Sequence, residues 1–127
     1  MSLESFPFHP SFDKEYIAEL FDNEASYFLE IMEYFFNNIP TEMSELNETF
    51  ASGDKLGFAK KLHKMSSMLG CVGQIEFSQL CKEVEKTFLQ TQEFIIPQQK
   101  MIENLQELLL HIQNDYDKIK MLTDEAQ

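Results

Sequence analysis

Hydrophobic residues recur every three or four positions along four long segments of this chain, a spacing that places them on one side of an α-helix. The first segment spans residues 23–50, the second follows a turn at 52–54 and ends at Gly73, the third ends near Thr91, and the fourth begins at Pro97. The hydrophobic positions are Phe28, Ile31, Phe35, Ile39, Met43, Leu46 and Phe50; Phe58, Leu62, Met65, Leu69 and Val72; Phe77, Leu80, Cys81, Val84 and Phe88; and Met101, Leu105, Leu108, Ile112, Tyr116 and Ile119. A shorter amphipathic segment covers 13–21, and nothing resembles a strand.

Local signals agree with this division of the chain. Asp54 can cap the second helix, Gly73 can end it in a left-handed conformation, and Pro97 suits a first helical turn. Pro40 lies inside the first helix, where it removes a backbone donor, so we expect a bend there. Amphipathic helices joined by short turns must bury their hydrophobic sides against one another. The sequence therefore predicts an all-α fold: an antiparallel four-helix bundle with a short additional N-terminal helix.

Length and composition narrow the class of protein. A chain of 127 residues fits one domain, so we expect a single domain over 1–127 in which 1–11 and 123–127 are flexible. The 12 Phe and seven Met fall largely on the hydrophobic sides of the helices. Core packing explains them better than a haem or flavin pocket, and we expect no cofactor. Two cysteines are too few for a disulfide scaffold.

The charge balance argues against two classes of ligand. A net charge of −12 repels nucleic acid and anionic membranes over most of the surface, so we expect neither as a partner. No hydrophobic stretch approaches the roughly 18 residues that would span a bilayer, and the first residues lack the pattern of a secretion signal. We expect a cytoplasmic monomer without membrane insertion.

One short region departs from the acidic character of the chain. Residues 55–64 hold four of the ten basic residues, and His63 lies among them. His63 is one residue, or about 100°, around the helix from the hydrophobic side, so we expect it to be accessible. Its neighbours one or two turns away include small residues, namely Ala59, Ser66, Ser67 and Gly70. Small neighbours leave the imidazole open to a docking partner; the alternative is an exposed histidine beside a groove between packed helices, with the lysines forming a solvated face.

The run AKKLHKMSSMLGCVGQIEFSQLCKEVE, residues 59–85, resembles the histidine-containing phosphotransfer (HPt) domain family. That family has a histidine, an apolar residue two positions on, Lys-Gly after it, a glycine ten positions on, and a Leu/Cys-rich helix that ends near Glu or Gln. Met65 and Gly73 match the apolar residue and the later glycine. Ser66 and Ser67 stand where the family usually has Lys and Gly, which shifts the role of the missing cation to Lys60 or Lys64.

The resemblance implies a phosphorelay intermediate. His63 would accept a phosphoryl group from a receiver-domain aspartate and pass it to another receiver, the partners being a hybrid sensor kinase and a response regulator. Phosphoryl or partner binding would fall to Lys60, Lys64, Ser66, Ser67 and Gly70. The receiver would supply the metal ion, so none is expected here. The alternative is a degenerate HPt-like adaptor that docks a partner without being phosphorylated.

Glu85 is the residue that the resemblance pairs with His63. It lies 12 residues after Gly73 and His63 lies 10 before it, so on two helices joined by that turn the side chains reach a similar height. In the family, a Glu or Gln at this position often accepts a hydrogen bond from the imidazole. We therefore expect Glu85 to orient the ring of His63.

Overall fold

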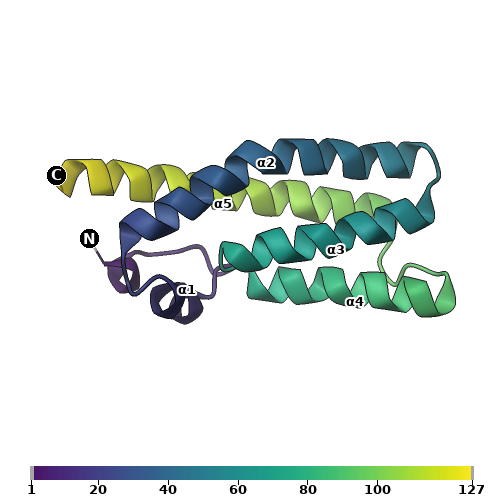
Figure 1. Cartoon of the computed structure of the whole chain (residues 1–127), viewed down its shortest axis with the longest axis horizontal. Helices are drawn as coiled ribbons and strands as arrows, with labels where there is room; N and C mark the ends of the chain where they lie inside the picture. The colour runs from purple at the N-terminus through teal and green to yellow at the C-terminus, as the bar shows by residue number, and fades with distance from the viewer. Residues whose placement is uncertain (1, 127) are drawn as a thin grey trace.

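A computed structural model describes residues 2–126 of the chain, and these residues form an all-helical structure without strands (Figure 1). The helices are α1 (Lys14–Leu20), α2 (Ala25–Ala51), α3 (Lys55–Cys71), α4 (Ile75–Thr91) and α5 (Gln98–Ala126), preceded by a 3-10 turn, η1 (Leu3–Ser5). The prediction of an all-α fold is confirmed for this part of the chain, including the short first helix.

The four long helices run lengthwise along the molecule and α1 lies at one end (Figure 1). α3 packs against both α2 and α4, and α5 packs against α2. The buried hydrophobic side chains of all five helices form one continuous core. This arrangement covers α3 on two sides, which limits how much of its surface can serve as a site.

The helix boundaries follow local chemistry. The Asp13 and Asp54 side chains accept hydrogen bonds from the backbone N–H groups of Tyr16 and Gly57, at 3.0 and 2.9 Å, and so cap α1 and α3. Gly73 ends the α3 region with φ +84°, as the sequence predicts. Pro40 lies inside α2, which remains continuous but changes direction along its length in Figure 1.

The N-terminal segment is part of the core. The sequence predicts flexibility over 1–11, yet Leu3 and Phe6 are buried, and the backbone N–H of His9 donates to the Asp115 carboxylate at 2.6 Å. Leu3 and Phe6 belong to the same hydrophobic core as the long helices. This part of the segment is therefore packed, where the sequence predicts flexibility. At the other end, where flexibility over 123–127 is predicted, the α5 backbone continues through residue 126; Met1 and Gln127 lie outside the described residues.

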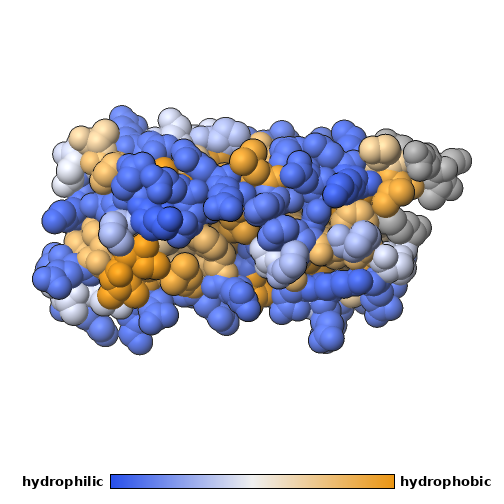
Figure 2. Space-filling model, turned by 180° about the vertical axis from the view of Figure 1, so that it is seen from behind, coloured by the Kyte–Doolittle hydropathy of each residue, from blue (hydrophilic) through white to orange (hydrophobic). Residues whose placement is uncertain are grey.

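The face of the molecule in Figure 2 is mainly hydrophilic, in keeping with the charge of the chain. On the face shown, hydrophobic side chains gather near the end of the molecule where α4 passes into α5. Leu89 and Ile95, from this connection, are about half exposed. Single exposed hydrophobic residues are ordinary on protein surfaces.

Candidate functional site

The imidazole of His63 projects from the exposed side of α3, with 68% of its side chain accessible to solvent. Its Nδ1 lies 3.1 Å from both carboxylate oxygens of Glu85 on α4. Glu85 is largely covered, with 16% of its side chain exposed. The predicted meeting of the two side chains is confirmed, because α3 and α4 fold back on each other at Gly73.

The Glu85 contact determines which nitrogen of His63 is free to react. An ionised carboxylate can only accept hydrogen bonds, so the Nδ1 that faces it carries the proton. In neutral imidazole the other nitrogen, Nε2, then holds a lone pair. When the ring is neutral, Nε2 is therefore the nitrogen with nucleophilic character.

Cys81 is the other potential nucleophile close to Glu85, one helical turn before it on α4. Burial, together with the negative charge of Glu85, raises the pKa of Cys81 to about 12. The thiol therefore stays protonated near neutral pH, and its sulfur is buried. His63, not Cys81, is the group at this place that can react.

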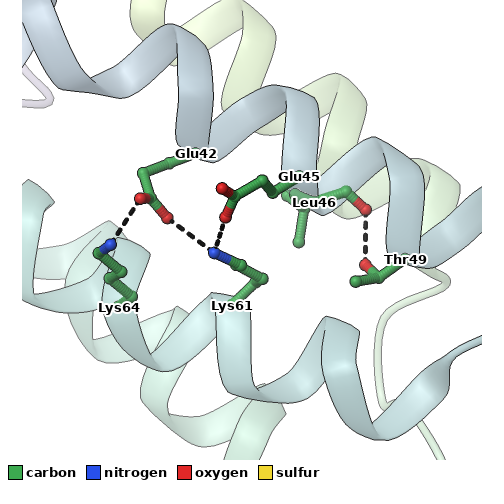
Figure 3. A network of polar contacts seen from close by, with 6 residues as sticks. All are labelled: Glu42, Glu45, Leu46, Thr49, Lys61 and Lys64. Carbon is green, nitrogen blue, oxygen red and sulfur yellow. Dashed lines mark hydrogen bonds and ion pairs between the residues drawn. The ribbon is translucent and has the colours of Figure 1, made fainter.

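Two of the lysines near His63 are already paired with a buried carboxylate (Figure 3). Glu42 of α2 has only 8% of its side chain exposed; Lys64 Nζ lies 2.6 Å from one oxygen and Lys61 Nζ 3.3 Å from the other. Burial alone would raise the Glu42 pKa, but hydrogen bonds from Lys64 and Lys61 outweigh it and lower the pKa. Lys61 also bonds Glu45, which raises the pKa of Lys61.

These pairs change the expected distribution of free cations. Lys64, predicted to bind a phosphoryl group, is held against α2 by Glu42. Lys60 is exposed and forms no ion pair with any side chain of residues 2–123. Of the two lysines predicted to act beside His63, Lys60 is thus the one available to an incoming ligand.

Some of the small residues near His63 are buried in the packing of the helices and others remain exposed. Ser67 is exposed and Gly70 half-buried, but Ser66 is fully buried, as is Ala59. Ser66 Oγ lies 3.1 Å from Ser78 Oγ of α4, which donates to the Ser66 carbonyl at 2.7 Å. Ser66 thus joins α3 to α4, and its binding of a phosphoryl group or a partner stays a prediction.

Grooves adjoin Ser67, one turn after His63. One of about 250 Å³ is purely hydrophobic except for Ser67; it is lined by Ile31, Tyr34, Phe35, Ser67, Met68, Cys71 and Val72. A second, of about 580 Å³, is shared by α1, α2, α3 and α4, and among its lining residues are Tyr16, Leu20, Ser67, Gly70 and Lys82. Sequence reasoning missed the residues from α1, α2 and α4, since no spacing within α3 shows which side chains of other helices face it.

Within residues 2–126 no group of three or more His, Cys, Asp or Glu side chains is arranged to hold a metal ion. No helix in the same range is both long and apolar enough to cross a membrane. No protein-family model, curated protein or solved structure matches the chain.

Proposed function

We propose that this protein is a phosphorelay intermediate of the HPt type, which accepts a phosphoryl group on His63 from a receiver-domain aspartate and donates it to a second receiver. The observation that carries the proposal is the pair of an exposed imidazole with its Nδ1 held by a covered carboxylate. The all-helical structure supports the proposal, because we infer that its four long helices form the antiparallel bundle of that family. The proposed setting is a cytoplasmic monomer in two-component signalling.

The proposed transfer uses the groups in place at His63. Nε2 attacks the phosphorus of the aspartyl phosphate; a P–N bond forms, the P–O bond breaks, and the aspartate leaves as a carboxylate with the electron pair. The ring, still protonated at Nδ1, becomes cationic, and the Glu85 carboxylate at 3.1 Å offsets that charge. Reversal of the same step onto another aspartate returns neutral imidazole.

The surroundings of His63 suit docking of a folded partner. Ser67 and Gly70 are small residues on the same side of α3 as His63, so a partner can approach closely. The hydrophobic groove beside Ser67 provides a surface that a partner can bury. A receiver domain brings its own metal ion and acidic residues, and Lys60, an exposed lysine one turn before His63 on α3, can meet them. In this scheme the chain needs no complete active site.

One observation favours the alternative, a docking adaptor without phosphoryl transfer. Ser66, at the position where the family usually has a lysine, is buried, and Lys64 is bound to Glu42. A site with fewer free cations can still bind a partner through its hydrophobic groove. The two functions differ in whether His63 becomes covalently modified.

The deciding experiment incubates the protein with a receiver domain whose aspartate has been phosphorylated by acetyl phosphate. We expect a label on the protein that is labile to acid and stable to base, present in wild type and in a His111→Gln control and absent from His63→Gln. A label retained by His63→Gln would contradict the assignment. Complex formation without any label on wild type would support the adaptor.

A further inference from the structure

A lysine far along the chain from the cluster around His63 lies at the edge of the same site. Lys82 of α4 lines the 580 Å³ groove together with Ser67 and Gly70 of α3. Its side chain is exposed and forms no ion pair with the side chains of residues 2–123. It is therefore a free cation, unlike Lys61 and Lys64.

Two neighbour relations place Lys82 close to the imidazole. On α4, Lys82 lies one turn before Glu85, whose carboxylate touches His63 Nδ1 at 3.1 Å. On α3, Ser67, which shares the groove with Lys82, lies one turn after His63. Side chains one turn apart on a helix have Cβ atoms about 5–6 Å from each other. The long, flexible lysine side chain can span such a distance.

A phosphoryl group on His63 would need such a cation. A phosphoryl group bound to a side chain carries a charge of about −1.5 to −2 near neutral pH. Here it would enter a protein of net charge −12, next to the Glu85 carboxylate. Lys61 and Lys64 are already paired with Glu42 and Glu45. Among the described side chains Lys60 has no ion-pair partner either, but it does not line the groove that Lys82 shares with Ser67.

We propose, building on the function proposed above, that Lys82 is the cation that pairs with the phosphoryl group at His63. It would supply from α4 the charge that the buried Ser66 cannot supply from α3. Lys82 would then act by attracting the phosphoryl oxygens, with no part in proton transfer.

The test uses phosphoramidate, a small donor that needs no docking partner. Nε2 bonds to phosphorus while the P–N bond of the donor breaks and ammonia leaves, so the measured rate reports on His63 and its nearby charges alone. We expect Lys82→Ala to slow phosphorylation of the full chain about fivefold, the factor equivalent to the ~1 kcal/mol of two unit charges 4 Å apart in water. Lys82→Arg should retain most of the rate, and high salt should shrink the difference.

Lys100→Ala is the matched control, because it removes the same charge from an exposed position on α5. Equal rates for Lys82→Ala and wild type, or an equal loss in Lys100→Ala, would overturn the role of Lys82 while leaving His63 as acceptor. If wild type takes no phosphoryl group on His63, from phosphoramidate or from a phosphorylated receiver, the proposed function itself fails and Lys82 has no phosphoryl group to bind.

Discussion

At His63 a single hydrogen bond sets the proposed nucleophile apart from an ordinary surface histidine. The Glu85 carboxylate, 3.1 Å from Nδ1 and mostly shielded from water, holds the proton on one nitrogen and leaves the other unprotonated. The same carboxylate would face the cationic ring that phosphorylation creates. One contact can thus favour both the reactive tautomer and the charged product.

Substitution of Glu85 separates these two effects. We expect Glu85→Ala to reduce transfer from a phosphorylated receiver about tenfold, equivalent to ~1.4 kcal/mol in the barrier. Glu85→Gln should retain much more of the rate, because its amide oxygen still accepts from Nδ1–H. Imidazole ¹⁵N shifts should show a smaller fraction of the Nδ1–H tautomer of His63 in the alanine variant. Glu83→Ala, at an exposed position of the same helix, is the control; unchanged shifts and rates in Glu85→Ala would refute the role of Glu85.

Between helices, polar side chains rather than hydrophobic ones determine which lysines and serines are free. Glu42 of α2 holds Lys61 and Lys64 of α3, and Ser78 of α4 holds Ser66 of α3. Each link engages a residue that its position on α3 alone would leave unpaired, and Ser66 is also buried. α3 is thus joined to its neighbours on both sides, with His63 on the part that stays open.

Glu42 gives this arrangement a pH dependence. Its pKa in the folded protein is lowered from the ordinary value of 4.5, so its ion pairs stabilise the fold fully above that value and less as the pH falls through the lowered pKa. We expect Glu42→Gln to lower the free energy of unfolding by about 1–3 kcal/mol near neutral pH. Urea titrations should show the difference from wild type shrinking in acid. Glu48→Gln, at an exposed position of α2, should show little effect; a pH-independent difference for Glu42→Gln would contradict the linkage.

On the scale of the whole molecule, the N-terminal segment and α1 close one end of the helical structure next to the site. The Gly73 carbonyl accepts a hydrogen bond from the Asp13 backbone N–H at 2.8 Å. A Cβ added at Gly73 would collide with the Ile17 side chain of α1. Tyr16 and Leu20 of α1 line the groove that also contains Ser67. The packing of α1 on the α3–α4 turn therefore shapes part of the proposed docking surface.

Two glycines of similar conformation allow this contact to be measured. Gly53 has φ +73° with no atom near an added Cβ, whereas Gly73 has φ +84° and faces Ile17. We expect Gly53→Ala to cost about 1 kcal/mol from backbone strain alone. Gly73→Ala should cost roughly 1–3 kcal/mol more, because the buried Ile17 side chain, or α1 with it, must shift. Unfolding in urea measures both variants; equal losses would show that α1 yields without cost.

The sequence by itself determined the number and approximate limits of the helices. Hydrophobic residues that recur every three or four positions are a property of each segment alone. It also indicated that His63 is exposed, from its position beside the hydrophobic side of its helix. Residue counts along two helices joined at Gly73 placed His63 level with Glu85. The partners of Lys64 and Ser66, the burial of Leu3 and Phe6, and the place of Lys82 beside the site were decided by the tertiary structure alone. Each depends on how helices distant in the sequence pack against one another. The spacing of residues within one helix does not show which side chains of the other helices it will meet.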